Sequence, residues 1–353
     1  MGDHGFEPPL ISTLPSPDSQ IEVDPRLFPG IMGMSGLEQL RPGFREKSSP
    51  PPVDRLTGYS LNTVERGRVT ATLPASRWLE WQDGLAPEGV AAIPADSAFG
   101  MAAYSTLPPG KACRTIELTM NFCAALSVGD GPLVIEGSVA YSDQDTILTE
   151  VTMRQDPGRI IAHGSSLLMI FPLVEEIPEP PTDPDAINDV RIGLKPYMLD
   201  TMGTGLKSAL LSNLTGTEVL EKYSSGEFDD LPIYHLLGIR PVSHEDEKFA
   251  FSLNSVQWLC SSLGSVQGGV LAFVAERAAW AAVTATQPRG AACRTSNIKV
   301  NYLRPVAATG RPVTAVGEVI WQGRNFALVA IRVLLDGTRM AASAVATVRL
   351  LST

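Results

Sequence analysis

Two carboxylates stand alone inside apolar, alanine-rich stretches of the chain. One is Asp96, and the other is Glu276, which lies within residues 268–283 and is followed directly by Arg277. An apolar stretch of this length indicates a buried helix, and an ionised carboxylate is costly to bury without a partner. Each acid is therefore either an exposed or ion-paired residue, or a functional group.

The second of these stretches begins with Gln267, Gly268 and Gly269. Glycines allow the backbone to pass close to a ligand, and the first N–H groups of a helix are unpaired at the positive end of its dipole. Such a turn can hold a developing oxyanion. An ordinary tight turn would have the same sequence, so both interpretations are open at this point.

The chain also repeats itself. Residues 108–115 (PPGKACRT) resemble residues 288–295 (PRGAACRT), and the same spacing pairs residues 36–170 with 216–350 without a gap. It makes Asp96 equivalent to Glu276, which favours a functional acid over an incidental one. The same spacing aligns Glu88 with Gly268, so the first copy has a negative charge where the second has a glycine. The first copy is therefore the poorer place for an oxyanion. A duplicated domain whose halves pair as a pseudo-dimer is predicted.

Each copy is predicted to be α+β, with an antiparallel sheet wrapped around one long central helix. Only one long helix is available per copy, which excludes a doubly wound sheet. In the second copy, the alternation of apolar and polar residues and the turn signals predict strands at residues 248–254, 294–303, 311–321, 326–336 and 340–350.

The domains follow from the repeat and from composition. Residues 36–171 and 215–353 form the two domains, joined by a linker over residues 172–214 that begins as a proline-rich acidic segment. Residues 1–35 form an N-terminal extension that we expect to be largely disordered.

Composition narrows the class of protein. Hydrophobic residues make up 44% and charged residues 19%, which is typical of a globular protein, and the net charge of −10 argues against general nucleic-acid binding. We expect no membrane partner, because no apolar run is long enough to span a bilayer. The N-terminus has no basic segment followed by an apolar one, which favours a cytoplasmic location. Four cysteines without a Cys-x-x-Cys pair and four scattered histidines favour neither a metal site nor a disulfide framework. No cofactor is implied.

The segment from Gln267 to Ala272, with Glu276 following, resembles the helix motif of PaaI-type hot-dog-fold acyl-CoA thioesterases, which reads His-Gly-Gly before a helix bearing Asp or Glu. Residues 301–305 (NYLRP) resemble the strand motif that follows in that family, and residues 323–324 and 336–337 resemble its later strands. The match is stronger in the second copy than in the first.

The resemblance implies two tandem hot-dog domains that build composite sites between their helices. One site would combine Gln267, Gly268 and Gly269 with Asp96, and the other would combine residues 87–89 with Glu276. In each, a helix N-terminus would polarise the thioester carbonyl, and the opposing carboxylate would attack it or activate a water. Gln267 replaces the family's usual histidine, and an amide cannot shuttle protons.

The resemblance also implies substrate-binding residues, namely Gly100, Asn301, Arg304, Gly323 and Arg324. The two arginines are candidates for binding the phosphates of coenzyme A. Gly100 follows Asp96 by one turn, whereas the equivalent residue after Glu276 is Trp280, which would fill a pocket. This difference favours the Asp96 site, although Pro94 is expected to disturb the helix just before Asp96.

The function implied is hydrolysis of acyl-CoA thioesters to free acid and CoA. A non-catalytic acyl-CoA-binding or scaffold protein is the alternative, since the histidine is lost and the copies differ. A hot-dog enoyl-CoA hydratase fits less well, because it needs a histidine near an aspartate on the central helix, and neither helix carries one. A homo-oligomer, a dimer of double hot dogs, is expected. The acyl chain and the number of active sites are left open.

Overall fold

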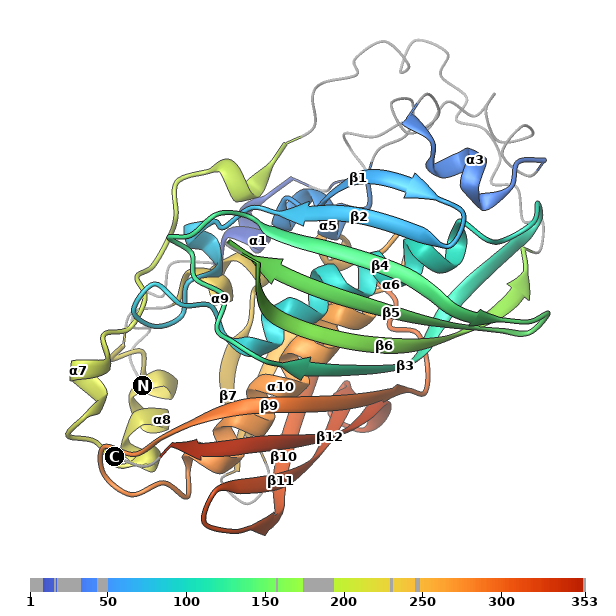
Figure 1. The fold of residues 1–353 in the computed structure, drawn as a ribbon. Helices are drawn as coiled ribbons and strands as arrows, with labels where there is room; N and C mark the ends of the chain where they lie inside the picture. The colour runs from blue at the N-terminus through green and yellow to red at the C-terminus, as the bar shows by residue number, and fades with distance from the viewer. Residues whose placement is uncertain are drawn as a thin grey trace.

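The computed structural model describes residues 9–15, 17, 33–42, 50–156, 158–173, 194–228, 231–244 and 248–351. Within them, the strands form one antiparallel sheet of twelve strands in the order β1-β2-β4-β5-β6-β3-β9-β12-β11-β10-β8-β7 (Figure 1). The first copy contributes β1 (Ser60–Glu65), β2 (Arg68–Leu73), β3 (Lys111–Phe122), β4 (Leu133–Ser142), β5 (Thr146–Gln155) and β6 (Arg159–Pro172). The second contributes β7 (Arg240–His244), β8 (Lys248–Asn254), β9 (Ala292–Tyr302), β10 (Pro312–Gln322), β11 (Phe326–Leu335) and β12 (Arg339–Leu351).

The two copies join through β3 and β9, which pair antiparallel in the middle of the sheet. Thr119 lies opposite Lys299, its own equivalent in the other copy, and Glu117 lies opposite Asn301. A register centred on equivalent residues gives the joint a local two-fold symmetry, like that of an isologous dimer. The predicted duplication into two paired domains is confirmed.

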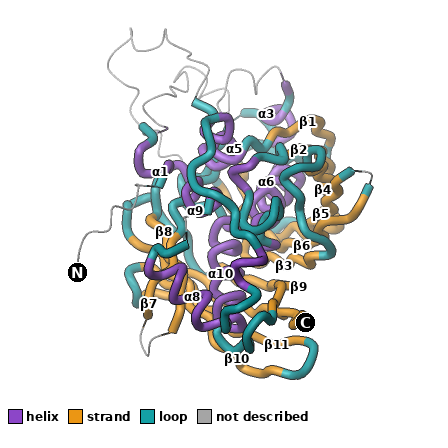
Figure 2. Tube along the Cα trace, turned by 90° about the vertical axis from the view of Figure 1, so that its left-hand side faces the viewer, coloured by secondary structure: helices purple, strands orange, loops and turns teal. Residues whose placement is uncertain are grey.

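Two helices lie side by side and pack against the sheet (Figure 2). The helix α6 (Ala92–Tyr104) packs against β2–β6, and α10 (Gly268–Thr284) packs against β8–β12. Glycines in the sheet allow this close approach. A Cβ atom on Gly137 would lie 3.1 Å from the carbonyl oxygen of Ala98, and one on Gly317 would lie 2.5 Å from that of Ala278. The two helices also contact each other, so Asp96 on α6 and Glu276 on α10 come from neighbouring elements.

The two helices begin differently. The residues equivalent to the first turn of α10 form a 3₁₀ helix in the first copy, η4 (Glu88–Ala91), and α6 starts only at Ala92. Pro94 explains the difference, because it has no N–H to donate to the carbonyl of Val90, whereas a proline fits the first turn of a helix that starts at Ala92. The expected disturbance at Pro94 takes the form of this 3₁₀ turn.

Short helices precede the strands of each copy in equivalent positions. The first copy has α3 (Gly36–Leu40) and α5 (Pro52–Thr57), and the second has α8 (Gly216–Ser225) and α9 (Pro232–Leu237). α3 and α8 both start at a capping box, and α5 and α9 both end at a glycine in the left-handed conformation. Other helical turns in the described part of the chain include α1 (Leu10–Thr13), η3 (Arg77–Leu79), η6 (Pro196–Met198), α7 (Ser208–Leu211) and η8 (Gln257–Leu259).

Part of the predicted N-terminal extension has a defined position. Leu10 and Ile11 of α1 are buried beside α9, and the indole Nε1 of Trp258 donates a hydrogen bond of 2.8 Å to the carbonyl of Pro15. Most of that extension, and residues 174–193 of the predicted linker, lie outside the described residues. Within the described part, no helix is both long enough and apolar enough to cross a lipid bilayer.

Candidate active site

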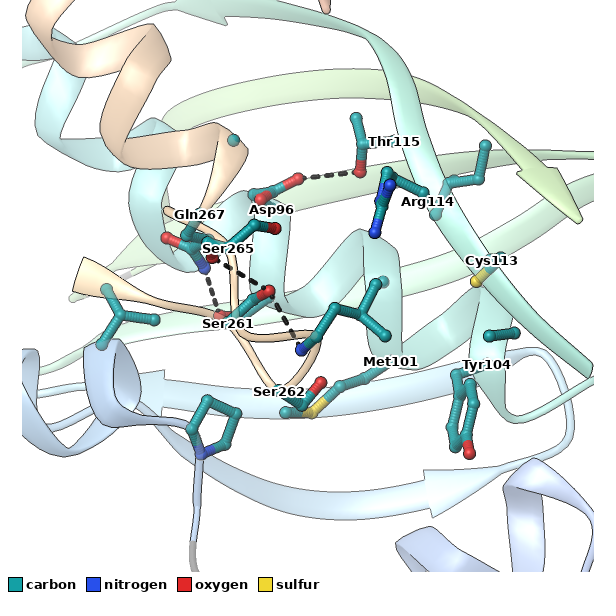
Figure 3. Close-up of a pocket in the computed structure, with 18 of the residues that line it drawn as sticks. Asp96, Met101, Tyr104, Cys113, Arg114, Thr115, Ser261, Ser262, Ser265 and Gln267 are labelled. Atoms are coloured by element: carbon teal, nitrogen blue, oxygen red, sulfur yellow. Dashed lines mark hydrogen bonds between the residues drawn. The ribbon is translucent and has the colours of Figure 1, made fainter. Parts of the chain in front are cut away.

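A cavity of about 650 Å³ opens where the N-terminus of α10 meets the side of α6. Both copies line it. The first copy contributes residues of α5, β1, α6 and β3, and the second contributes residues 261–268 and 302–306. Figure 3 shows Asp96 and Gln267 near one another, with Met101 and Tyr104 farther along α6. The cavity is thus a composite site between the two domains.

Asp96 connects the two helices at the wall of this cavity. Its side chain is buried, and its Oδ2 accepts a hydrogen bond of 3.1 Å from the backbone N–H of Gly269 in the other copy. Its Oδ1 accepts a hydrogen bond of 3.0 Å from the hydroxyl of Thr115 on β3 (Figure 3). The structure therefore brings the acid of one copy to the helix N-terminus of the other.

Burial raises the pKa of Asp96, because a carboxylate loses its hydration inside the protein. Hydrogen bonds from the Gly269 N–H and the Thr115 hydroxyl favour the charged form and offset part of that rise. In its ionised form, an acid with these partners can accept a proton from water and later return it.

Gly268 lies in direct contact with this carboxylate. A Cβ atom on Gly268 would lie 3.2 Å from Oδ2 of Asp96 and 3.0 Å from Cζ of Tyr302. The Tyr302 hydroxyl donates a hydrogen bond of 2.7 Å to the carbonyl of Gly268, which fixes the turn from the other side. Glycine is therefore the residue that best fits between the two side chains.

Gln267 is the residue before the first turn of α10, and its amide reaches across to α6. Its Nε2 donates to the carbonyl of Ile93 at 3.2 Å and to the hydroxyl of Ser97 at 2.7 Å. The Ser97 hydroxyl in turn donates to Oδ1 of Asp54 on α5 at 2.6 Å. A hydrogen-bonded chain therefore leads from the cavity wall to a second buried carboxylate.

Two predicted substrate-binding residues line the cavity. A Cβ atom on Gly100 would find no atom within 4 Å, so this position faces open space, and Arg304 lies at the exposed edge. The other three, Asn301, Gly323 and Arg324, are not among the lining residues.

Their positions in the fold explain this. Asn301 lies in β9 opposite Glu117, at the joint between the copies. Gly323 and Arg324 form the turn after β10, where Gln322 accepts a hydrogen bond of 2.9 Å from Thr286 just beyond the end of α10. The Asp96 site lies at the opposite end of this helix, about 25 Å away for its length.

The equivalent site around Glu276 is packed with charged side chains. Arg277 donates two hydrogen bonds of 2.7 Å to the Glu276 carboxylate, and Thr295 donates a third. Glu88 lies 3.8 Å from Arg277 and is ion-paired with Arg294. Burial and the negative charge of Glu276 raise the pKa of Glu88, while the two arginines oppose that rise.

Aromatic rings complete this packing. The guanidinium of Arg277 lies 5.0 Å from the ring centre of Trp81 and 5.2 Å from that of Trp280, and the two rings meet edge to face at 5.3 Å. Gly89 lies so close to Glu276 that a Cβ atom there would be 2.8 Å from the Cβ of Glu276. Glu276 therefore occupies the place that corresponds to Asp96, but as a member of a buried ion cluster.

Three polar residues of the Asp96 site went unnoticed in the sequence. Thr115 stands in the repeated Ala-Cys-Arg-Thr segment, so the repeat itself was the signal for it. Asp54 and Ser97 carry no such signal, because neither has a like residue in the other copy. Within the described ranges, no three His, Cys, Asp or Glu side chains gather closely enough to hold a metal ion.

Comparison with known proteins supports this architecture. Residues 88–162 and 263–342 each match the family model of the thioesterase superfamily. No curated protein matches the chain. A solved structure from Novosphingobium aromaticivorans, named provisionally as a thioesterase, is 15% identical with a TM-score of 0.50 and covers 83% of this chain and 99% of its own.

Two further solved structures are similar. The TesB protein of Mycobacterium avium subspecies paratuberculosis is 11% identical with a TM-score of 0.47, and the match covers 85% of this chain and 98% of that one. A Bacillus halodurans protein solved with CoA is 23% identical with a TM-score of 0.33, over 35% of this chain and 81% of its own. Both copies therefore match the same thioesterase-superfamily model at equivalent positions, in keeping with a duplicated hot-dog fold.

Proposed function

We propose that this chain hydrolyses acyl-CoA thioesters to a free acid and CoA at the Asp96 site, as PaaI-type thioesterases do. One observation carries the proposal: a buried carboxylate, held by a threonine and by the helix N-terminus of the other copy, at the wall of a large cavity. The Glu276 site takes no part, because its carboxylate is fully engaged by Arg277 and Thr295.

The reaction follows from these contacts. Asp96 removes a proton from a water while the water oxygen attacks the thioester carbonyl carbon, so the carbonyl oxygen becomes negative. The N–H of Gly268, at the positive end of the α10 dipole, stabilises that oxygen. When the tetrahedral intermediate collapses, the carbon–sulfur bond breaks and the proton on Asp96 passes to the leaving thiolate.

The remainder of the substrate is placed by the shape of the cavity. Arg304 stands at its exposed edge, where a guanidinium can bind a phosphate of CoA. The inner wall along α6 carries Gly100, Met101 and Tyr104, and Tyr104 donates a hydrogen bond of 2.8 Å to Gln39. The acyl group would lie along this wall, past the open space that Gly100 leaves.

Steady-state hydrolysis of a panel of acyl-CoAs by the wild type and by Asp96→Asn tests the proposal. The asparagine keeps the shape of the side chain but cannot accept the proton, so we expect kcat to fall by about 10²–10⁴-fold with a similar KM. Because burial raises the pKa of Asp96, wild-type kcat should fall as the pH drops through that raised value. Unchanged turnover in a folded Asp96→Asn variant would refute the proposed site.

A further inference from the structure

We propose that Asp54 and Ser97 are positioning residues, which act through the side chain of Gln267 to hold the N-terminus of α10 against Asp96. This inference rests on the proposed hydrolysis at Asp96. It adds a second, hydrogen-bonded layer of residues to the site, formed by Ser97 on α6 and by Asp54 on the short helix α5.

The hydrogen bonds determine which way the Gln267 amide faces. An amide nitrogen has two protons, and both are used, one by the carbonyl of Ile93 and one by the hydroxyl of Ser97. Ser97 can accept that proton because its own hydroxyl proton is donated to Asp54. In its ionised form Asp54 only accepts hydrogen bonds, so above its pKa of about 7 it sets the direction of the whole chain.

The consequence is a buried acceptor without a partner. Oε1 of Gln267 is shielded from solvent and has no hydrogen-bond partner among the described residues, although Gln267 itself lines the cavity. A buried polar atom left unpaired is costly, and native proteins seldom leave one without a reason. This cost indicates that the direction of the amide serves the site, because it gives both protons of the nitrogen to α6.

Asp54 is tied to the same loop that carries Gln267. The N–H of Val53 donates to the carbonyl of Cys260 at 3.2 Å, and the N–H of Gln267 donates to the carbonyl of Leu259 at 2.9 Å. Asp54 itself is buried near Asp96, and burial raises its pKa to about 7. Burying a second acid beside the first opposes folding, so packing alone does not account for it.

The packed site shows what happens without this chain. Gln267, Ser97 and Asp54 correspond there to Pro87, Arg277 and Tyr234. All three positions differ, and Arg277 is committed to Glu276. The amide and the two residues that orient it thus occur together at the open site and are all absent at the packed one.

A double-mutant cycle on kcat tests the inference. Ser97→Ala, Asp54→Leu and Gln267→Ala should each lower kcat by about 10- to 100-fold, with little change in KM. If Ser97 and Asp54 act through Gln267, adding Ser97→Ala or Asp54→Leu to Gln267→Ala should cost nothing further. Ser97→Thr retains the hydroxyl and should restore most of the rate.

Thr57→Val is the matched control. Thr57 is a buried hydroxyl on the same helix as Asp54, bonded only to its own helix at 2.9 Å, so this variant should keep wild-type kcat. Fully multiplicative losses in the cycle, or an equal loss in Thr57→Val, would overturn the inference and reduce Asp54 and Ser97 to structural residues.

A second readout does not depend on hydrolysis. In protein labelled with ¹⁵N on glutamine side chains, Gln267→Asn identifies the Gln267 amide signals, and Ser97→Ala and Asp54→Leu should shift both of them. Thr57→Val should leave them in place. If the wild type failed to cleave thioesters, the proposed function would be refuted, but this experiment would still report on the hydrogen bonds from Asp54 through Ser97 to Gln267. If the signals did not move, those hydrogen bonds themselves would be refuted.

Discussion

The Asp96 and Glu276 sites occupy equivalent positions in the two copies, but their surroundings differ. In both, the carboxylate accepts a hydrogen bond from the equivalent threonine, Thr115 or Thr295, and lies against a glycine at the start of the opposing helix. One carboxylate borders a cavity, and the other is enclosed by arginine and tryptophan. The two acids are therefore placed alike, and the neighbouring side chains leave a cavity beside Asp96 but fill the space beside Glu276.

Two substitutions account for most of this difference. Ser97 corresponds to Arg277, which neutralises Glu276, and Gly100 corresponds to Trp280, which packs against Trp81. A carboxylate with a bidentate arginine partner is committed to that ion pair and is not available as a base. Our proposal therefore gives the acid a catalytic role in one half and a structural role in the other, and the following variants test that contrast.

Glu276→Gln should have the largest effect on stability. It leaves Arg277 buried without its bidentate carboxylate, with Glu88 3.8 Å away as the remaining acid. Removing one partner of a buried pair typically costs about 3–5 kcal/mol. We expect denaturant unfolding to show this loss while kcat per folded molecule stays close to wild type. A stable Glu276→Gln variant with strongly reduced kcat would show that catalysis belongs to the Glu276 site and not to the Asp96 site.

Gly268→Pro tests the helix N-terminus of the open site. Proline removes the N–H that we assign to the thioester oxygen, and it is tolerated in a first helical turn. Loss of one oxyanion donor typically lowers turnover by about 10²–10³-fold. Gly268→Ala is the control, since its Cβ presses on Tyr302 and Asp96 in the same way but the N–H remains. Equal activity in the two variants would show that this N–H does not hold the carbonyl.

Gly100→Trp transfers the plug of the closed site into the open one. The Gly100 position faces empty space, so a tryptophan should fit there without unfolding the chain and should exclude the acyl group. We expect kcat/KM to fall by roughly 10- to 100-fold, the equivalent of about 1–3 kcal/mol, with a thermal midpoint near wild type. If kcat/KM toward every acyl-CoA were unchanged, the acyl group would have to lie elsewhere.

The repeat allowed much of the site to be predicted. It established the duplicated domains, and with the family resemblance it paired Asp96 with the turn from Gln267 to Gly269, which the structure brings together. The ion pair of Glu276 with Arg277 was one of the two interpretations of that acid in the sequence, and it is the one that the structure has.

The remaining residues were beyond such an argument. Arg324 and Arg304 both looked available to phosphate, but they lie at opposite ends of α10, and only the fold separates them. The chain from Asp54 through Ser97 to Gln267 joins residues far apart in sequence, and it depends on side-chain directions that composition and periodicity do not contain. Long-range polar contacts of this kind are set by packing.

A structure of the chain with a non-hydrolysable acyl-CoA analogue, in which a methylene group replaces the thioester sulfur, tests the central claim most directly. We predict one analogue per chain, with its carbonyl oxygen within hydrogen-bond distance of the Gly268 N–H and its carbonyl carbon facing Asp96. The acyl group should lie past Gly100, and the Glu276 cluster should be unchanged. An analogue bound beside Glu276, with Arg277 displaced, would contradict the account.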